Sequence, residues 1–201
     1  MKIICLDLEG VLVPEIWIAF SEATGITELC RTTRDEPDYD KLMRFRLGLL
    51  KQHNLKLGDI QKVIGRMSPL EGAYDFARKV RERTQLVILS DTYEEFAKPL
   101  MEKLDWPTLF CNSLEVSSNG EITGYRLRQN EGKKHAVAAF HSLNMKIFAA
   151  GDSFNDLEMI KDADEGCFFR APQKIILDYP AIQSTESYDG LLEKIDRFLR
   201  G

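Results

Sequence analysis

The sequence of 201 residues contains no apolar run that approaches the roughly 18 residues needed to cross a membrane. Its beginning also lacks the pattern of a signal peptide, because strand-like sequence and two acidic residues start at once. Internal repeats, low-complexity tracts and linker-like stretches are absent as well. We therefore expect a cytoplasmic protein that forms one domain, with room for an inserted second lobe, and that has no membrane partner.

Paired cysteines and an excess of basic residues are also missing. The four cysteines, Cys5, Cys30, Cys111 and Cys167, are far apart and form no CxxC pair. This favours reduced thiols packed as small hydrophobic side chains over a zinc site or a disulfide framework. The net charge of −5 and the pI near 5.4 argue against a nucleic-acid partner. Any basic group in a binding site should therefore be a local feature.

The sequence does contain short apolar runs that alternate with amphipathic helical patterns. The predicted strands are residues 3–6, 85–89, the run around Phe110, 146–150 and 167–169. The predicted helices between and after them cover 68–83, 94–104, 133–143 with Leu143 on the apolar face, and the segment through Leu191, Ile195 and Phe198. This alternation indicates an α/β fold with a doubly wound parallel sheet. Alternating runs around Asn119 and Gly120 predict a hairpin, which we interpret as an edge decoration.

Between the first strand and residue 67 the patterns are helical, and no run resembles a strand. Residues 14–24, 41–53 and 57–64 each carry apolar side chains at helical spacing. The polar run 32–40 is predicted to be a loop. We interpret residues 14–67 as a compact helical lobe inserted into a main domain formed by residues 1–13 and 68–201.

Three of the predicted strands end in acidic or hydroxyl side chains, and parallel strands bring their carboxyl ends to one rim. These residues are Asp7 and Glu9 after the first strand, Ser90, Asp91 and Thr92 after the second, and Asp152 and Asp156 after the fourth. Acids on two strands can share a hard cation, for which Mg²⁺ is the usual choice. The hydroxyl of Ser90 can bind phosphate together with backbone N–H groups, and Lys133 at a helix start can offset the charge of phosphate and aspartate.

Four segments in this order resemble the four motifs of the haloacid dehalogenase (HAD) superfamily of phosphotransferases. They are DLEGVLV at 7–13, LSDT at 89–92, the lysine at 133 and GDSFND at 151–156. The helical lobe resembles the small cap of the phosphoserine phosphatase branch. The whole chain, including DLEGVLVPEIW and RDEPDYD, is most similar to the ThrH group of that branch, whose members are described as phosphoserine phosphatases and as phosphoserine:homoserine phosphotransferases. The resemblance implies a HAD-like doubly wound sheet with an inserted helical cap.

The resemblance also implies roles for the residues at the rim. Asp7 would be the nucleophile, Glu9 the general acid and base, and Lys133 the balancing cation, with Lys134 as the alternative lysine. Mg²⁺ would be held by Asp7, the backbone carbonyl of Glu9 and Asp152, while Asp156 would act through water or orient Lys133. The wider superfamily has aspartate where this chain has Glu9. Because the ThrH-like group itself shows glutamate there, we expect catalysis to survive.

Substrate choice should depend on the helical lobe. The resemblance implies that Glu15 and Arg46 match the phosphoserine phosphatase positions that hold the ammonium and carboxylate of phosphoserine, and Arg44 remains an alternative to Arg46. The polar side chains proposed near the phosphate or substrate are Ser90, Asn155, Asp91 and Thr92. The last two are equally compatible with capping the following helix.

The favoured function is a Mg²⁺-dependent phosphatase that acts on L-phosphoserine through a phosphoaspartyl intermediate, with water or homoserine as the acceptor. Two alternatives stay open: a phosphatase for another small metabolite, such as a sugar phosphate, and a non-catalytic regulator that binds phosphate with the same fold. The expected partners are small molecules, and the expected assembly is a monomer or a homodimer.

Overall fold

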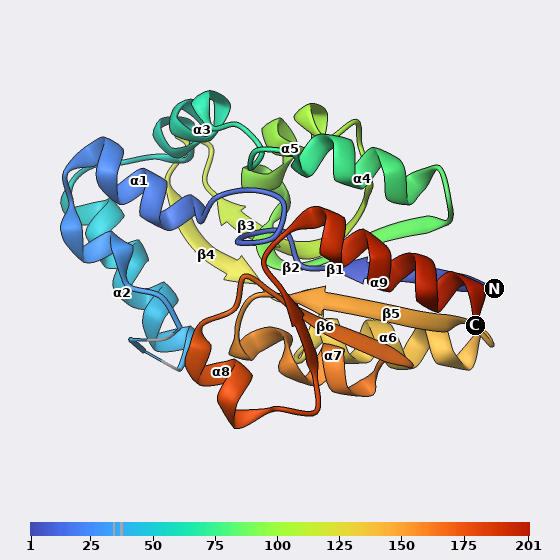
Figure 1. The fold of residues 1–201 in the computed structure, drawn as a ribbon. Coiled ribbons are helices and arrows are strands. Elements are labelled where there is room, and N and C mark those ends of the chain that lie inside the picture. Colours follow the sequence, from blue (N-terminus) through green and yellow to red (C-terminus); the bar gives the residue numbers. More distant parts are fainter. Residues whose placement is uncertain (34, 37) are drawn as a thin grey trace.

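The computed structural model describes residues 1–33, 35–36 and 38–201. This part of the chain forms a seven-stranded sheet with the order β4-β3-β2-β1-β5-β6-β7 (Figure 1). In this sheet β3 and β4 pair antiparallel, and the other neighbouring strands pair parallel. The strands are β1 (Lys2–Leu6), β2 (Gln85–Tyr93), β3 (Thr108–Val116), β4 (Ile122–Arg126), β5 (Lys146–Gly151), β6 (Glu165–Phe169) and β7 (Gln183–Thr185). The predicted doubly wound parallel sheet is confirmed.

Strand β1 lies at the centre of the sheet because its short apolar run is buried on both faces. Leu6 is paired with Ile88 of β2 and with Ala150 of β5, so the end of β1 lies level with these two residues. The N–H of Asp7 donates to the carbonyl of Ala150 at 3.0 Å, which extends the ladder by one residue. The register therefore places the residues after β1 and β5 beside residues 90–92 of β2 at one rim.

Helices cover both faces of the sheet, as the alternation of side chains along the strands requires. Ile4 and Leu6 face one layer, while Ile3 and Cys5 face the other. The first layer contains α4 (Ala73–Arg81), α5 (Glu94–Lys103) and α9 (Tyr188–Arg200). The second contains α6 (Gly132–Ser142), α7 (Leu157–Asp162) and α8 (Gln173–Asp178) (Figure 1).

The segment between β1 and α4 is helical, as its patterns predict. It contains α1 (Ile16–Thr24), the 3₁₀ helix η1 (Thr27–Cys30), α2 (Tyr39–Gln52) and α3 (Leu57–Arg66). Helix α1 ends at Gly25, whose φ of 72° is in the left-handed region that glycine adopts without strain. Among the described residues, none of the helices is long and apolar enough to span a membrane.

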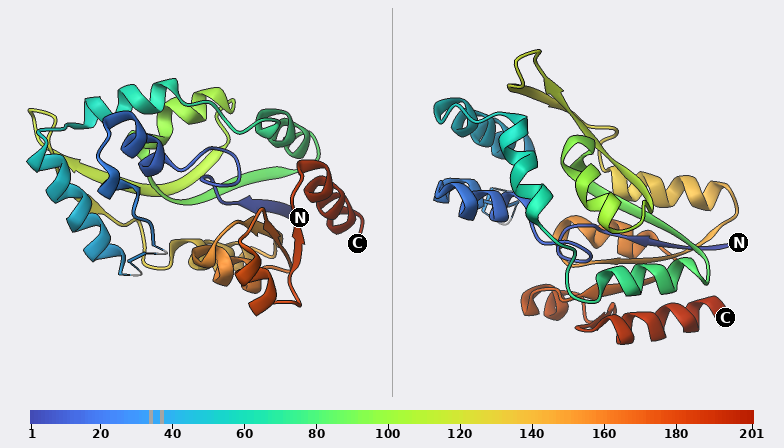
Figure 2. Two further views of the ribbon diagram at one scale, coloured as in Figure 1. Left: turned by 60° about the vertical axis from the view of Figure 1, so that its left-hand side comes forward. Right: turned by 90° about the horizontal axis from the view of Figure 1, so that it is seen from above.

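The β3–β4 hairpin lies at the sheet edge as predicted, but it is more than a decoration. Figure 2 shows it extending from the sheet alongside the helical lobe, and β4 contacts α2. The N–H of Leu57 donates to the carbonyl of Gly120 at 3.0 Å, and the hydroxyl of Tyr125 donates to Asp40 at 2.8 Å. The hairpin thus attaches the lobe to the sheet.

Several local predictions differ from the structure. Strand β2 does not end at Leu89, because after a register shift Tyr93 pairs with Asn112 of β3. Leu143 was placed on an apolar face, but α6 ends at Ser142 and Leu143 is 64% exposed. Cys30 is exposed, whereas the other three cysteines are buried, and all four thiols are free. Helix α4 starts only at Ala73, after Gly72 with φ of 82°. Helix α8 and strand β7 were not predicted.

Candidate active site

The centre of the rim is an ion-pair cluster around Lys133, which projects from the first turn of α6. Its Nζ lies 2.9 Å from Oδ1 of Asp7 and 2.7 Å from Oδ1 of Asp156. A third carboxylate, Asp91, is 3.6 Å away. Asp7 is 5% exposed and Lys133 is 6% exposed, so solvent screens their interaction little. The neighbouring Lys134 instead pairs at the surface with Glu131 and Glu158, so Lys133 is the one of the two lysines that lies in this cluster.

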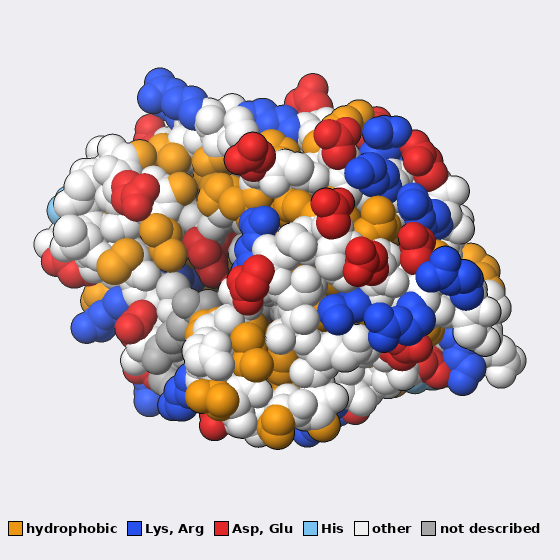
Figure 3. Space-filling view, viewed as in Figure 1, with side chains coloured by type: hydrophobic (Ala, Val, Ile, Leu, Met, Phe, Trp, Pro, Cys, Tyr) orange, Lys and Arg blue, Asp and Glu red, His pale blue; other side chains and the backbone are white. Residues whose placement is uncertain are grey.

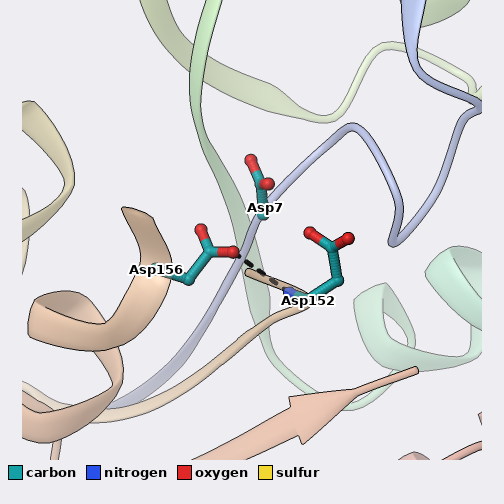
Figure 4. A group of neighbouring side chains, drawn as sticks. All are labelled: Asp7, Asp152 and Asp156. Carbon is teal, nitrogen blue, oxygen red and sulfur yellow. Dashed lines mark hydrogen bonds between the residues drawn. The ribbon is translucent and has the colours of Figure 1, made fainter. Parts of the chain in front are cut away.

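Asp7, Asp152 and Asp156 form a buried group of carboxylates that suits a metal ion. Each offers an oxygen, and these oxygens all lie within 4.8 Å of one another. Figure 4 shows the three side chains converging from the ends of β1 and β5 and from the start of α7. Buried carboxylates repel one another, and hard oxygen donors in this arrangement are the ligands that Mg²⁺ and Ca²⁺ prefer. The donor set therefore fits a divalent cation.

The oxygens of Asp156 are largely engaged by the protein. Oδ2 accepts hydrogen bonds from the N–H groups of Asp152 at 3.0 Å and Ser153 at 3.1 Å, and from the hydroxyl of Ser153. Oδ1 accepts from Lys133. Asp156 therefore contacts Lys133 directly. Its action on a metal through water stays a prediction.

Two glycines make room for these carboxylates. A Cβ atom on Gly10, whose φ is +76°, would meet the carboxylate of Asp152, and a Cβ on Gly151 would meet that of Asp156. Any larger residue at either position would displace a carboxylate from the rim. The glycines in DLEGVLV and GDSFND thus allow the backbone to lie close to the acidic side chains.

Burial and charge set the protonation of this cluster. Burial and the neighbouring Asp156 raise the pKa of Asp7 despite the opposing effect of Lys133. Burial alone would lower the pKa of Lys133, but Asp156, Asp7 and Asp91 outweigh it and raise the pKa above its ordinary value. Lys133 therefore remains charged. A divalent cation beside Asp7 would favour the ionised carboxylate.

Glu9 is held at the start of the helical lobe. Its Oε2 accepts a hydrogen bond of 2.8 Å from the N–H of Ile16, the first residue of α1. Burial, followed by the charge of Glu15, raises the pKa of Glu9 to about 7, although the Ile16 N–H, Arg46 and a hydrogen bond from Thr92 oppose the shift. A carboxyl with this pKa can donate and accept a proton near neutral pH.

The segment Ser90–Asp91–Thr92 lies within β2 and faces the cavity. Neither Asp91 nor Thr92 caps α5, because the residue that precedes this helix is Tyr93 and no side chain caps it. The hydroxyl of Ser90 accepts from the N–H of Thr92 at 3.2 Å. Asn155 donates from Nδ2 to Asp91 at 3.1 Å, which joins the ends of β2 and β5. The capping alternative for Asp91 and Thr92 is therefore wrong.

Arg46 of α2 is buried in the cavity, whereas Arg44 is exposed and pairs with Asp40 at 2.6 Å. Desolvation lowers the pKa of Arg46, an effect opposed by Tyr39, Glu9, Tyr93 and Glu15. Of the two arginines, Arg46 is therefore the one that lines the cavity.

One cavity of about 100 Å³ is lined by every predicted site residue except Asp156. Its surface is hollowed between the helical lobe and the sheet, with acidic side chains around the hollow (Figure 3). The sequence did not single out Trp17, Tyr39 and Tyr93, which also line the cavity. The hydroxyls of Tyr39 and Tyr93 lie 2.6 Å apart, and that of Tyr39 lies 3.3 Å from the carbonyl of Asp91. Buried aromatic residues usually belong to a core, so only their position in the folded structure identifies these three as cavity residues.

Comparison with known proteins agrees with this geometry. Residues 12–161 match the family model of the haloacid dehalogenase-like hydrolases. The chain is 53% identical over 191 residues to phosphoserine phosphatase ThrH of Pseudomonas aeruginosa, with 95% of this chain and 93% of the relative covered.

Solved structures share the fold at lower identity. A substrate-bound phosphoserine phosphatase complex has a TM-score of 0.78 at 23% identity, covering 98% of this chain and 97% of the other. A phospho-aspartyl intermediate analogue of phosphoserine phosphatase has a TM-score of 0.78 at 20% identity, covering 96% and 98%. The two neighbours establish a shared architecture over nearly the whole chain.

Proposed function

The chain belongs to the haloacid dehalogenase-like hydrolases, and from this premise we propose that it hydrolyses L-phosphoserine through a phosphoaspartyl intermediate on Asp7. The observation that carries the proposal is the buried pairing of Asp7 with Lys133 at 2.9 Å, in a cavity that Glu9 also lines. A nucleophile, a cation for the phosphate and a proton donor thus line one cavity.

In the first step, a carboxylate oxygen of Asp7 attacks phosphorus as the bond from phosphorus to the serine oxygen breaks. Glu9 gives its proton to that leaving oxygen, which becomes the hydroxyl of serine. In the second step, Glu9 takes a proton from the attacking water, whose oxygen bonds to phosphorus while the acyl phosphate bond breaks. Asp7 and protonated Glu9 are restored, and inorganic phosphate is released.

Lys133 would balance charge on the phosphoryl oxygens throughout both steps. Ser90 and Asn155 line the same cavity and are the proposed polar contacts of the phosphate, with Asp91 holding Asn155 in place. Thr92 lies beside Glu9 and would help to orient it.

The metal proposed for this site is Mg²⁺. Its ligands would be Asp7, Asp152 and the backbone carbonyl of Glu9, with Asp156 contributing through water or through Lys133. When bound, the cation would supply charge neutralisation that lets an anionic carboxylate approach an anionic phosphate. The spacing of the three buried carboxylates supports this assignment.

Recognition of the amino acid is assigned to the helical lobe. Arg46 would bind the substrate carboxylate and Glu15 its ammonium group, because both line the cavity and carry the complementary charges. We propose that residues 14–67 act as a cap for substrate specificity over a catalytic domain formed by 1–13 and 68–201. The cavity is lined from both segments, which supports that division.

The test is to incubate the protein with phosphoserine and Mg²⁺, with and without homoserine, and to follow free phosphate and phosphohomoserine. Hydrolysis is the expected outcome, and phosphohomoserine would show that an alcohol competes with water for the intermediate. Asp7→Asn should abolish both products. Turnover by Asp7→Asn at the rate of the unchanged protein would contradict the covalent mechanism.

The same assay separates the alternatives. Rapid turnover of a sugar phosphate with no turnover of phosphoserine would indicate a different small-metabolite phosphatase. Binding of phosphate without turnover of any phosphomonoester would indicate a non-catalytic regulator.

A further inference from the structure

The guanidinium of Arg46 is held in an unusual way for a buried cation. Its central carbon lies 4.5 Å from the centre of the Trp17 ring, so the ring covers one face of the group. Nη2 donates to the carbonyl of Arg31 at 2.6 Å, and Nη1 donates to the sulfur of Met43 at 3.8 Å. No carboxylate of the described residues forms an ion pair with it. The buried Nε is without a hydrogen-bond partner.

This arrangement leaves the guanidinium with a buried donor that no group of the described residues satisfies. A buried charge without an ionic partner is costly, and an aromatic face compensates only part of that cost. The carbonyl of Arg31 and the sulfur of Met43 engage the terminal nitrogens, so the unsatisfied donor is Nε. A planar carboxylate in the cavity can form two parallel hydrogen bonds with a guanidinium, which would offset the cost of burying this charge.

Trp17 is itself fixed by aromatic neighbours. Its ring meets Phe20 and Phe96 edge to face, with centroids 6.4 and 5.6 Å apart. Trp17 belongs to α1 and Arg46 to α2, two neighbouring helices of the lobe (Figure 1). Because the ring is anchored on its edges and lines the cavity, it restricts the plane in which the guanidinium can lie.

We propose that Trp17 is a positioning residue that determines specificity: its ring holds the Arg46 guanidinium in a fixed plane, in which it can pair with the carboxylate of the substrate. The protein therefore favours phosphomonoesters that carry a carboxylate next to the ester over those that carry only an ammonium group. This inference rests on the proposed function and extends it to a residue that does not itself need to contact the substrate.

The test compares two phosphate esters that differ in one group. Phosphoserine carries a carboxylate and an ammonium group, whereas phosphoethanolamine carries only the ammonium group. Trp17→Leu should raise KM for phosphoserine about 5- to 20-fold, the range of a desolvated cation–π contact, and change kcat little. Its kinetics with phosphoethanolamine should stay within about twofold. Trp17→Phe keeps an aromatic face and should recover most of the loss.

Two further variants separate positioning from packing. Phe198→Leu removes a buried aromatic ring of α9 that packs against Phe148 rather than against Trp17 or Arg46, so it should leave the ratio of the two substrates unchanged. In an Arg46→Ala background, Trp17→Leu should have no further effect on that ratio. If Trp17→Leu alters both substrates equally, or if its effect persists without Arg46, the ring only packs and the inference is wrong.

A second readout keeps this inference distinct from the proposed function. With p-nitrophenyl phosphate as the reporter substrate, inhibition by phosphoserine and by phosphoethanolamine can be measured in the unchanged protein and in Trp17→Leu. If phosphoserine inhibits but is not hydrolysed, the proposed function fails. A selective loss of phosphoserine inhibition in the variant would still support the role of Trp17, and an equal loss for both inhibitors would refute it.

Discussion

Glu9 connects the chemistry of the site to the backbone of the helical lobe. Its carboxylate reaches the N–H of Ile16, and burial together with Glu15 raises its pKa to about 7. Aspartate is one methylene shorter and could not reach this N–H from the same backbone position without a shift. The glutamate of this chain therefore has a structural role in addition to the catalytic one proposed for it.

Replacing Glu9 with glutamine removes the proton but keeps the shape of the side chain. Release of serine needs a proton, whereas p-nitrophenolate is a good leaving group without one. We therefore expect Glu9→Gln to lose phosphoserine turnover by about 10²- to 10⁴-fold. With p-nitrophenyl phosphate it should give one rapid equivalent of product and then slow turnover, measurable by stopped-flow absorbance. A steady rate with no burst, equally reduced for both substrates, would contradict the assigned role.

Arg46 and Arg44 of α2 offer a test residue and its control, because one lines the cavity and the other is exposed. Arg46→Ala removes the proposed carboxylate ligand and should raise KM for phosphoserine by about 10- to 100-fold, the range of a charged hydrogen-bonded contact. KM for p-nitrophenyl phosphate should change far less. Arg44→Ala, whose guanidinium pairs with Asp40 at the surface, should leave both constants within about twofold. Equal effects of Arg46→Ala on both substrates would exclude a carboxylate contact.

At the scale of elements, Asp164 joins α6, β5 and the start of β6. Its carboxylate accepts from the N–H of Ile147 at 2.9 Å, contacts His141 at 2.9 Å and pairs with Lys146 at 2.7 Å. Partial burial raises its pKa, but Lys146, the Ile147 N–H and His141 outweigh this and lower it to about 2. These contacts favour the ionised form in the folded state.

Because the folded-state pKa of Asp164 lies below its ordinary value of 3.8, its contribution to stability is present above pH 3.8 and is lost as the pH falls through about 2. Asp164→Asn should lower the free energy of unfolding by about 1 kcal/mol at pH 7, after allowance for solvent screening. The difference from the unchanged protein should shrink below pH 3.8. Urea denaturation at several pH values measures this. Asp162→Asn is the control, and a pH-independent loss for Asp164→Asn would contradict the linkage.

The elements that the sequence predicted well are those with a strong local signal. The apolar runs of β1, β2 and β5 are buried on both faces, so composition alone identifies them. Strand β7 has only three half-buried residues, Gln183 to Thr185, and lacks any such run. The extension of β2 to Tyr93 depends on pairing with Asn112, a contact 19 residues away that no local pattern encodes.

At the scale of the whole molecule, the sequence predicted the acidic rim because parallel strands obey a general rule. Asp7, Ser90, Lys133 and Asp152 line one cavity as that rule requires. The aromatic residues of the cavity, Trp17, Tyr39 and Tyr93, were not predicted as site residues. Trp17 meets Arg46, and Tyr93 meets Tyr39, only through tertiary packing. An aromatic residue in an apolar sequence pattern looks the same in the sequence whether it packs in the hydrophobic core or lines a binding site.

The proposed metal site should make stability depend on divalent cations. A cation that binds only the folded protein at 100 times its Kd adds about 2.7 kcal/mol, which would raise Tm by several degrees in a chain of this size. We expect Mg²⁺ to raise Tm relative to EDTA in differential scanning fluorimetry, and Asp152→Asn to remove most of that shift. Glu158→Gln, an exposed acid on α7, is the control. An undiminished shift in Asp152→Asn would place the cation elsewhere.

The hydrogen bond between Glu9 and Ile16 also bears on the timing of the reaction. Helix α1 begins at Ile16, so a swing of this helix away from the sheet would carry off the N–H that orients the proton donor. Closure of the lobe over the substrate and orientation of the Glu9 carboxyl group would then occur in the same movement. In an open form the enzyme would hold the substrate without a correctly oriented proton donor. The acyl phosphate would then form only after the helix has closed over the cavity and excluded bulk water.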